Sequence, residues 1–425
     1  MLQVARIKAE PERVIEGLRK RNISEPEQVV QQILDVDQRR RGTQLKLDEV
    51  LAAANAAAKE IGKLMKAGNK EAAEAAKART GALKAESKTL TEKLREAEQE
   101  LNTLLYNTPN VPHTAVPAGK NSDDNEEMEQ DGTVPKLGEG ALPHWELVKQ
   151  FNLIDFELGN KITGAGFPVY IGQGARLQRA LINYFLDCAE EAGYREVIPP
   201  LLVNEDSGLG TGQLPDKEGQ MYEVTADELY LIPTAEVPIT NIYRNEIVKK
   251  EDLPIKHAGY TPCFRREAGN WGAHVRGLNR LHQFDKVELV QVQHPDKSYE
   301  TLEEMTEHVR ALLKSLHLPY RLLRLCGGDM GFTAALTYDF EVYSAAQGQW
   351  LEVSSVSNFE TYQANRLKLR YRDENNKPQL AHTLNGSALA LPRILAAILE
   401  NNQDGNQIHI PEVLRKYTRF HAIGL

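Results

Sequence analysis

Two long stretches with a seven-residue apolar repeat constrain the fold of the N-terminal part of this chain. Between about residues 27 and 66 a seam steps by four and three, and a second seam follows the break at residues 67–69. The seam positions are Leu47, Leu51, Ala54, Ala58, Ile61 and Met65, then Leu83, Ser87, Leu90, Leu94, Ala97, Leu101 and Leu104. This spacing predicts two helices paired as an antiparallel coiled coil. At about 1.5 Å per residue each helix reaches roughly 55–60 Å, so we expect a protruding arm.

The composition of this helical hairpin leaves its role open. Basic residues are interleaved with acidic ones along it, among them Arg39, Arg40, Arg41, Lys59, Lys63, Lys66 and Lys70. Such mixing is typical of a solvated helix face. A structural spacer, a dimerisation arm and a binding arm all remain compatible with the sequence.

Length and charge set broad limits on the rest of the molecule. A chain of 425 residues exceeds the size that one core usually serves, so we expect two or more structural units. The formal net charge of -9 does not favour a nucleic-acid partner. A local basic face can still bind phosphate, because net charge is only an average.

The cysteines and the apolar runs point to a cytoplasmic protein. Cys188, Cys263 and Cys326 are far apart and show no paired spacing, so neither a disulfide framework nor a structural zinc site is expected. No apolar run approaches the length of a membrane span, and the N-terminus has no secretory core. We therefore predict a cytoplasmic location and no membrane partner.

The helical pattern ends near Asn107, and the segment up to about residue 142 is rich in Pro, Gly and acid. We interpret 111–142 as a linker whose acidic run, residues 123–127, is solubilising. After Pro143 the pattern predicts an amphipathic helix over 177–192. Strands are expected around 197–203, 229–232, 286–292, 322–325, 340–342 and 350–353. Few helices separate them, so the predicted class is α+β with a mainly antiparallel sheet flanked by helices, in domains 1–110 and 143–425.

The densest set of chemically useful side chains lies between Phe264 and Glu288. Alternating apolar residues from Phe284 onward predict a strand, and the glycines before it predict a hairpin. Arg265 and Arg276 are expected to project from this hairpin toward a common site, where their planar guanidinium groups suit phosphate. Surface ion pairs are the alternative for an isolated Arg-x-Glu. The chain has neither a P-loop nor a dinucleotide glycine fingerprint, so a nucleotide site must be built differently.

Seven short strings carry a resemblance to a known family. They are 210–215 (GTGQLP), 233–236 (PTAE), 261–269 (TPCFRREAG), 282–284 (HQF), 328–332 (GDMGF), 352–358 (EVSSVSN) and 385–393 (NGSALALPR). In this order they resemble the bacterial-type seryl-tRNA synthetases, which are class II aminoacyl-tRNA synthetases, over essentially the full length of the chain. The resemblance implies an N-terminal tRNA-binding domain with the coiled-coil arm, followed by a class II catalytic domain.

The resemblance also implies three class II signature motifs and an ATP site. The proline-bearing strand ending at Pro199-Pro200 corresponds to motif 1, a dimer-interface element, and the motif 2 and motif 3 matches are 264–288 and 386–393. By this match the catalytic residues are Arg265, Glu352 and Arg393. The implied ATP-binding residues are Arg265, Arg266, Glu267, Phe284, Glu352, Val353, Ser354, Ser355 and Arg393, with Glu352 and Ser355 holding Mg²⁺.

Within that set the resemblance gives each side chain a task. Arg265 would hold the α-phosphate and the serine carboxylate, and Glu267 the adenine amino group. Phe284 would stack on adenine, with Arg393 on the other ring face and at the γ-phosphate. Positioned charge would neutralise the phosphoryl oxygens without a protein general base.

A serine pocket is implied as well, made of Thr234, Ala235, Glu236, Arg265, Glu288, Asn385 and Ser387. Alanine would leave buried polar groups of this pocket unpaired, at about 1–3 kcal/mol each, and threonine would lack room. Taken singly, Thr234 and Asn385 also suit turn or capping positions. His282 is either an orienting hydrogen-bond partner or a core residue and receives no catalytic role. No Cys/His set is present for zinc-based serine recognition.

For the arm, the resemblance implies a grip on the long variable arm of serine tRNA bound to the other subunit of a homodimer. Selenocysteine tRNA is a second candidate substrate. The motif 2 loop departs from the family pattern at Ala273 and His274, where a basic residue followed by Asp is expected, while Arg276 is retained.

Two other classes of protein stay open. A paralogue that delivers its activated amino acid to a carrier protein or another acceptor would have no use for the long arm. A non-catalytic binding protein with a coiled-coil arm would not need the set Arg265, Glu267, Glu352 and Arg393. The sequence therefore favours ATP-dependent activation of L-serine and its transfer to the 3′-terminal adenosine of serine tRNA.

Overall fold

The structure is a computed structural model that describes residues 1–217, 219–267 and 276–424. The chain forms two compact units. The helical unit comprises Leu2–Arg19 and Ile23–Pro109, and the sheet unit comprises Met1, Lys20–Asn22 and Asn110–Leu425. Among the described residues, no helix is both long enough and apolar enough to cross a membrane.

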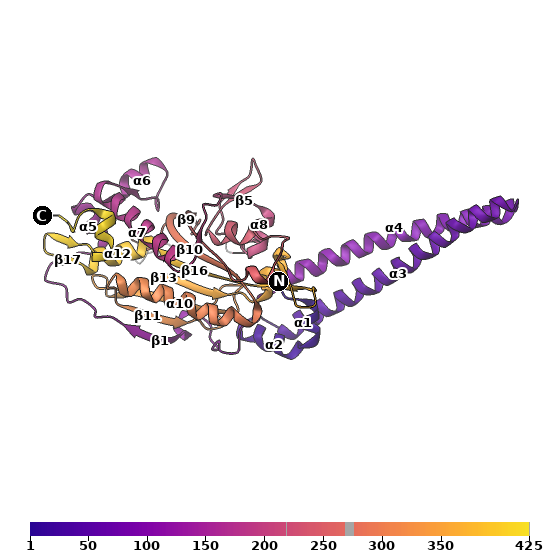
Figure 1. The fold of residues 1–425 in the computed structure, drawn as a ribbon, viewed down its shortest axis with the longest axis horizontal. Coiled ribbons are helices and arrows are strands. Elements are labelled where there is room, and N and C mark those ends of the chain that lie inside the picture. Colours follow the sequence, from indigo (N-terminus) through magenta and orange to yellow (C-terminus); the bar gives the residue numbers. More distant parts are fainter. Residues whose placement is uncertain (218, 268–275, 425) are drawn as a thin grey trace. The chain divides into compact units, whose positions relative to one another are not determined.

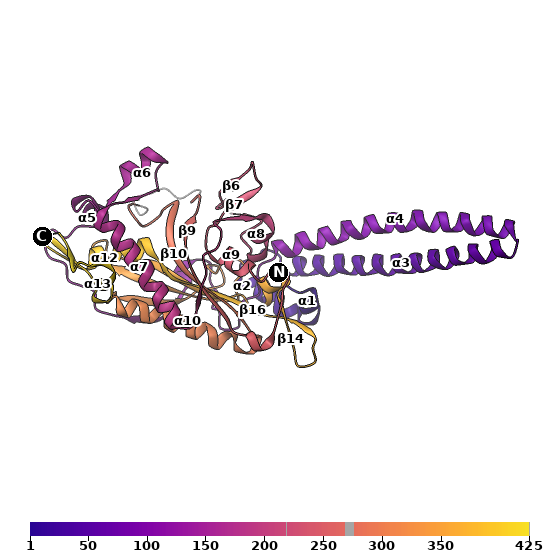
Figure 2. The same ribbon diagram turned by 45° about the horizontal axis from the view of Figure 1, so that its top comes forward.

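The helical unit is dominated by two long helices that lie side by side and run in opposite directions (Figures 1 and 2). Its helices are α1 (Val4–Ala9), α2 (Pro11–Lys20), α3 (Pro26–Lys66) and α4 (Lys70–Asn107). The turn between α3 and α4 is closed by Asn69, whose side chain accepts a hydrogen bond from the Ala72 N–H at 3.2 Å. Gly68, at φ +77°, supplies the left-handed residue that ends α3. The predicted helical hairpin and its break are confirmed.

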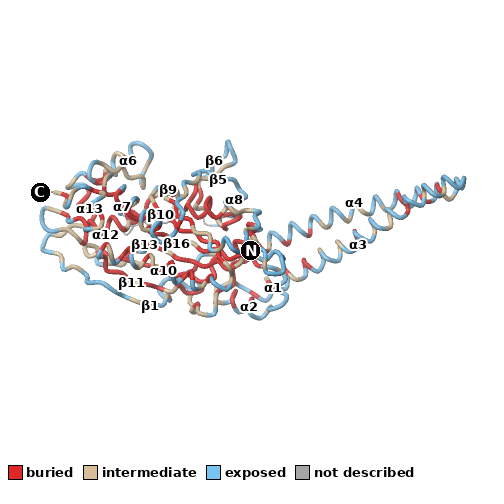
Figure 3. Tube along the Cα trace, in the orientation of Figure 1, coloured by how far each residue is buried: buried red, intermediate tan, exposed pale blue. Residues whose placement is uncertain are grey.

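The predicted seam of α3 is wrong at every second position. Leu51 and Met65 are 44% and 54% exposed, whereas their neighbours Val50 and Leu64 are half-buried. Figure 3 shows the change between exposed and less exposed residues along α3. Ala58 is likewise exposed and Ala57 buried. Both sets of positions obey a seven-residue repeat, and apolar residues occupy each adjacent pair, so spacing alone could not choose between them. The seam predicted for α4 is at least half-buried throughout.

An eight-stranded sheet organises the sheet unit. In spatial order it consists of β1 (Glu126–Asp131), β11 (Tyr320–Arg324), β12 (Leu336–Ser344), β13 (Gln349–Asn358), β16 (His382–Ala390), β10 (Gln283–Gln293), β9 (Ile255–Phe264) and β4 (Arg195–Glu196). All neighbouring pairs are antiparallel except β4 and β9. The predicted α+β class with a mainly antiparallel sheet is confirmed.

Helices cover this sheet and complete the core. The helices of the sheet unit are α5 (His144–Gln150), α6 (Phe156–Ile162), α7 (Gly172–Glu191), α8 (Glu205–Thr211), α9 (Glu236–Asn241), α10 (Ser298–Ser315), α11 (Thr361–Leu367), α12 (Leu391–Asn401) and α13 (Glu412–Thr418). Fully buried side chains such as Phe185 of α7, Leu302 of α10 and Ile394 of α12 join the sheet residues in one apolar cluster. The amphipathic helix predicted over 177–192 is α7, which begins five residues earlier. Gly174 in its first turn lies against the Leu153 carbonyl, where a Cβ atom would come within 2.1 Å of the oxygen.

Four small sheets lie around the main one. They are β15 (Pro378–Leu380), β14 (Arg370–Arg372) and β8 (Ile247–Val248); β17 (Gln403–Asp404), β18 (Gln407–His409) and β19 (Ala422–Ile423); β2 (Ile154–Asp155) and β3 (Val169–Tyr170); and β5 (Leu202–Asn204), β7 (Leu229–Leu231) and β6 (Glu223–Val224). Of the strand predicted over 197–203, only Leu202 and Val203 are in a strand, at the start of β5. The preceding strand β4 ends at Glu196, before the predicted range, and two prolines at 199 and 200 interrupt the segment between them.

The segment 111–142, interpreted as a linker, contains the edge strand β1, and the acidic run 123–127 extends into its first two residues. Its carboxylates pair with basic residues on neighbouring elements: Glu126 with Arg324, and Glu129 with Arg310 at 3.0 Å. Glu129 also accepts a hydrogen bond from the buried Tyr320 hydroxyl at 2.6 Å. Acidic residues have low strand propensity, so the sequence of β1 alone did not predict a strand. Its charges are complementary to β11, and they also leave a charged outer edge that resists pairing with another chain.

Candidate active site

A cavity of about 470 Å³ lies over the central strands of the main sheet. Twelve of the predicted site residues line it: Thr234, Glu236, Arg265, Glu267, Phe284, Glu352, Val353, Ser354, Ser355, Asn385, Ser387 and Arg393. They come from β10, β13, β16, the start of α12, the segment that follows β9, and the start of α9 with the residues just before it. The structure therefore brings residues that are more than 150 positions apart in the sequence into one site.

Three predicted site residues do not line this cavity. Ala235 is fully buried and packs against Ile239 and Val290. Arg266 is exposed, and its backbone N–H is bonded to the Gln220 carbonyl at 2.8 Å. Glu288 is fully buried behind the cavity wall. Of the three, only Glu288 is bonded to side chains that line the cavity, as described below.

Arg265 directly follows β9, at the end of the β9–β10 hairpin where the connecting loop begins. Its backbone N–H donates to the His282 carbonyl at 2.9 Å, and the His282 Nδ1 atom donates to the Arg265 carbonyl at 3.0 Å. The Arg265 guanidinium carbon lies 5.3 Å from the centre of the Phe284 ring. His282 is therefore an orienting partner of Arg265, one of the two roles that the sequence left open.

Glu267 lies at the last described position before the loop and has a left-handed backbone with φ +49°. Its N–H donates to the Gln220 Oε1 atom at 3.2 Å, and its carboxylate is paired with Arg280. Arg280 lines the cavity and was not predicted. Its position four residues after Arg276, on the returning limb of the same hairpin, is the sequence signal that could have identified it.

A buried pair of side chains, His144 and Glu400, supports the segment that leads into β10. The Leu278 N–H donates to the His144 Nε2 atom at 2.8 Å, so Nδ1 of the same ring carries the proton and donates to Glu400 at 2.7 Å. Both side chains are fully buried. Gly277 has φ +69°, and a Cβ atom there would come within 2.3 Å of the His144 ring. These contacts fix the start of the segment that carries Asn279 and Arg280 into the cavity.

The opposite side of the cavity presents Arg393 and Glu352. The Arg393 Nη1 atom donates to the Glu352 carbonyl at 2.8 Å, and its Nε atom donates to the Asn279 carbonyl at 3.0 Å. Ser355 is paired across the sheet with Asp339 of β12. Burial, and then the nearby Glu352 carboxylate, hold the pKa of Asp339 well above its usual range. The Asp339 Oδ1 atom is buried and has no hydrogen-bond partner among the described residues.

A network of short polar side chains closes the far end of the cavity. Glu288 accepts hydrogen bonds from Thr234 at 3.3 Å, Asn385 at 3.0 Å and Ser387 at 3.5 Å. Lys286, which is almost fully buried, forms an ion pair with Glu288 and donates to the Thr234 hydroxyl at 2.8 Å. Lys286 was not predicted, although its place two residues before Glu288 puts both side chains on one face of β10. Glu288 thus orients three side chains that face the cavity, and Lys286 balances its charge.

Thr234 also has the local role that its residue type suggests. Its hydroxyl accepts a hydrogen bond from the Glu236 N–H at 3.2 Å, which closes the turn before α9. The turn role and the cavity role are therefore combined in one residue. Asn385, in contrast, lies inside β16, so the turn alternative is wrong for it.

Glu236 is the buried carboxylate at this end of the cavity. Burial, followed by the like charge of Glu288, raises its pKa to about 7, while a hydrogen bond from Gln363 and the charges of Lys286 and Arg265 oppose the rise. A carboxylate in this state gains strongly from a cationic ligand, because such a ligand offsets the cost of burying the charge. The cavity therefore offers a site for an ammonium group at Glu236 and several cationic groups for phosphate elsewhere.

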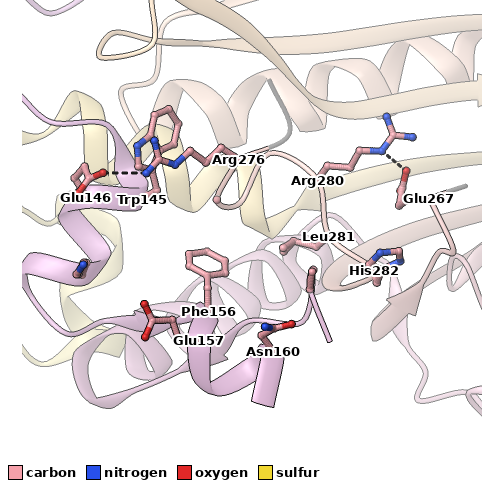
Figure 4. A pocket seen from close by; sticks show the side chains of 14 residues that line it. Trp145, Glu146, Phe156, Glu157, Asn160, Glu267, Arg276, Arg280, Leu281 and His282 are labelled. Carbon is pink, nitrogen blue, oxygen red and sulfur yellow. Dashed lines mark hydrogen bonds and ion pairs between the residues drawn. The ribbon is translucent and has the colours of Figure 1, made fainter. Parts of the chain in front are cut away.

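A second cavity of about 470 Å³ lies next to the first and shares Glu267, Arg280 and Leu281 with it (Figure 4). Arg276 lines this second cavity, where it pairs with Glu146 at 3.2 Å and lies 5.1 Å from the centre of the Trp145 ring. The expectation that Arg265 and Arg276 project toward a common site is therefore wrong. The departure at Ala273 and His274 lies outside the described residues.

Taken together, the antiparallel sheet and the arginine-bearing hairpin define the class II aminoacyl-tRNA synthetases. A family model described as the tRNA synthetase class II core domain (G, H, P, S and T) matches residues 221–402. A second model, the seryl-tRNA synthetase N-terminal domain, matches residues 1–112.

Relatives of the chain specify the family. The chain is 51% identical to a serine–tRNA ligase of Salinibacter ruber, with 100% of this chain and 99% of that protein covered. It is 44% identical to a serine–tRNA ligase of Pelodictyon phaeoclathratiforme, again over 100% and 99% of the two chains. A seryl-tRNA synthetase of Pyrococcus horikoshii, solved with ATP, superposes with a TM-score of 0.93 at 34% identity, covering 100% of this chain and 99% of that one. The chain belongs to the seryl-tRNA synthetase family.

Proposed function

We propose that the larger cavity activates L-serine with ATP to form seryl-adenylate and then transfers the seryl group to the 3′-terminal adenosine of serine tRNA. The observation that carries this proposal is the division of charge within the cavity. One end has a buried carboxylate, Glu236, among short hydroxyl and amide groups, and the other presents Arg265 and Arg393 on opposite walls. That arrangement suits a small amino acid beside a nucleoside triphosphate.

Serine is recognised at the end organised by Glu288. Glu236 binds the ammonium group, and Thr234, Asn385 and Ser387, held by Glu288, surround the side-chain hydroxyl. Alanine leaves these buried polar groups without a partner, which costs about 1–3 kcal/mol per group. Threonine requires room for one more methyl group next to the wall. Arg265 completes the subsite on the carboxylate side.

ATP is placed so that the serine carboxylate faces its α-phosphorus. Phe284 and Arg393 hold the adenine ring between them, Glu267 accepts a hydrogen bond from its amino group, and Arg265 binds the α-phosphate. Val353 and Ser354 add contacts around the nucleotide. One serine carboxylate oxygen forms a bond to the α-phosphorus while the bond to pyrophosphate breaks, and Arg265 neutralises the charge that develops. Alignment of the two substrates supplies much of the acceleration.

Glu352 and Ser355 have the chemistry to hold Mg²⁺ with ATP. Oxygen ligands suit this ion, and the unpartnered, buried Asp339 oxygen next to Ser355 shows a local excess of negative charge that a cation would offset. When bound, Mg²⁺ supplies charge neutralisation at the phosphate oxygens. Zinc plays no part in the proposal.

In the second step the 3′-hydroxyl of the terminal adenosine attacks the seryl carbonyl. The new ester bond forms as the bond to AMP breaks. The hairpin of α3 and α4 binds the long variable arm of serine tRNA, mainly through shape and phosphate contacts. Selenocysteine tRNA is a second candidate, because the proposal places recognition in the variable arm rather than in the anticodon.

The proposal extends to the organisation of the molecule. Residues 1–110 form the tRNA-binding domain, 111–142 connect it, and 143–425 form the catalytic domain of a cytoplasmic homodimer. The motif 1 segment supports dimerisation, since Ile198 is 87% exposed and Leu202 is 41% exposed. A cluster of exposed large apolar side chains is typical of a surface that another protein covers.

Serine-dependent ATP–pyrophosphate exchange, run beside alanine and threonine, tests the first step, and charging of serine tRNA tests the second. We expect exchange with serine alone and charging of the intact tRNA. Exchange without charging would instead support a paralogue with another acceptor. No exchange with any amino acid would leave a binding protein.

A further inference from the structure

Gln363 of α11 is a fully buried amide behind the serine end of the cavity. Its Nε2 atom donates to the Glu236 Oε1 atom at 2.6 Å and to the Thr211 carbonyl at 3.2 Å. Its Oε1 atom accepts a hydrogen bond from the Thr383 hydroxyl at 2.7 Å. The side chain does not line the cavity, so it reaches a ligand only through Glu236.

The Thr211 carbonyl determines which end of the amide faces Glu236, because a carbonyl can only accept and so requires the NH₂ group on that side. The Thr383 hydroxyl then donates to the amide oxygen and holds the side chain in this orientation. A fixed N–H donor favours the ionised form of a carboxylate over the protonated form. Met or Leu at this position would provide no such donor.

The charged surroundings of Glu236 make this donor important. From β10 the Glu288 carboxylate disfavours ionisation of Glu236 and Lys286 favours it, and from the end of β9 Arg265 also favours it. Gln363 is the uncharged group that bonds directly to the carboxylate. Without the hydrogen bond from Gln363, burial and the charge of Glu288 would raise the pKa of Glu236 further.

We propose that Gln363, oriented by Thr383, is a positioning residue that keeps Glu236 ionised and aimed at the ammonium group of the amino-acid substrate. The inference rests on the proposed function, because it assigns the ammonium group to Glu236. It adds two residues, one of α11 and one of β16, that act on serine affinity without touching serine.

The test is the pH dependence of serine-dependent ATP–pyrophosphate exchange in Gln363→Met, measured on the full-length protein. Protons compete with serine for Glu236, so a higher pKa of Glu236 moves the acidic limb of kcat/KM for serine to higher pH. A rise of about one unit multiplies the KM for serine about tenfold on the acidic side and changes it much less above about pH 8. We expect kcat at saturating serine and the KM for ATP to change less than about threefold.

Matched variants separate this role from loss of structure. Thr383→Val removes the hydroxyl at constant shape and should shift the profile in the same direction by a smaller amount, because the amide of Gln363 is then held by fewer hydrogen bonds. Thr383→Ser keeps the hydroxyl and should restore the wild-type profile. Tyr362→Phe, at the adjacent buried residue of α11, should lower the melting temperature without moving the pH profile.

An unchanged acidic limb in both Gln363→Met and Thr383→Val would overturn the inference, as would a KM that rises by one factor at every pH. If Gln363→Met does not fold, Thr383→Val against Thr383→Ser decides the question. Failure of the proposed function is distinct, since the wild-type protein would then show no serine-dependent exchange at all.

Discussion

At the scale of single residues, the serine end of the cavity contains two buried carboxylates with different surroundings. Glu288 is paired with Lys286 and receives three further hydrogen bonds, so its charge is balanced within the protein. Among the residues that the structure describes, Gln363 is the one side chain that donates directly to Glu236, whose pKa is raised to about 7. This difference supports the proposal that Glu236 binds the ammonium group of the substrate.

The raised pKa of Glu236 predicts a pH-dependent affinity for serine. Above about pH 7 the carboxylate is ionised and binds the ammonium group; as the pH falls through that value, protonation removes the charge and the KM for serine rises. Glu236→Gln should abolish this acidic limb and raise the KM for serine by at least about 100-fold at pH 8, the loss of a charge-assisted pair. Steady-state exchange across the pH range measures both effects. If the rise of the KM for serine at acidic pH persists in Glu236→Gln, another group is responsible for it.

We predict that replacing Lys286 lowers both the stability of the protein and its affinity for serine. Replacing it by Met leaves the fully buried Glu288 without its counter-charge, and removing one partner of a buried pair costs about 3–5 kcal/mol. We expect a clearly lower melting temperature and weaker serine binding, measured by thermal unfolding and by exchange kinetics. Lys256→Met is the control, because its contact with Glu304 spans 4.0 Å and is partly exposed. Equal effects of the two substitutions would contradict the role given to Lys286.

At the scale of secondary-structure elements, the sequence predicted those features that depend on residues close together in the chain. It did not predict those that depend on packing against distant segments. The limits of α3 and α4 follow from heptad spacing and from the Gly68-Asn69 turn, all of which are local. The register of α3 against α4 is not local, because Leu51 and Val50 are both apolar and only packing against α4 decides which is buried. For the same reason β1 could not be predicted, since its acidic side chains become compatible with a strand only beside Arg321 and Arg324 of β11.

The different burial of Leu47 and Leu51 in α3 predicts different effects of the same substitution, so that Leu51 serves as the control for Leu47. Leu47 is 6% exposed and Leu51 is 44% exposed, although both were assigned to the seam from spacing. Leu47→Ala should destabilise the helical unit by about 2 kcal/mol or more, while Leu51→Ala should change its stability by less than about 0.5 kcal/mol. Thermal unfolding of the full chain followed by circular dichroism measures the difference. A larger effect at Leu51 would restore the original seam.

The candidate site shows the same division between local and distant information. Residues such as Arg265, Glu267 and Arg393 were predicted because they lie in recognisable strings. Lys286, Arg280 and Gln363 were not, since their roles arise from partners on other strands or helices: Thr234, Glu267 and Glu236. Arg276 lies in the hairpin yet faces the second cavity, because it pairs with Glu146 of α5. Side-chain direction at a loop is set by tertiary contacts that spacing does not encode.

At the scale of the whole molecule, the two units are assigned separate tasks. The proposed chemistry of serine activation uses only residues of the sheet unit, and the long helices of the helical unit carry none of them. Their length is explained by a large partner, and the proposed one is the variable arm of tRNA.

This division predicts that the two steps depend differently on tRNA structure. Serine tRNA without its variable arm should leave serine-dependent exchange unchanged, because exchange requires no tRNA. Charging of the same tRNA should fall by at least about 100-fold in kcat/KM, the equivalent of several lost contacts. A filter assay of aminoacylation, with the intact tRNA in parallel, measures this. Equal charging of both tRNAs would contradict the role of the helical unit.

We claim that one cavity holds serine and adenylate together, and a crystal structure with a non-hydrolysable seryl-adenylate analogue is the decisive test. We expect the ammonium group at Glu236, the phosphate-like group at Arg265 and the adenine ring between Phe284 and Arg393. Gln363 should keep its contact with Glu236 in that complex. An analogue bound in the neighbouring cavity beside Trp145, or one whose ammonium group does not contact Glu236, would contradict the claim.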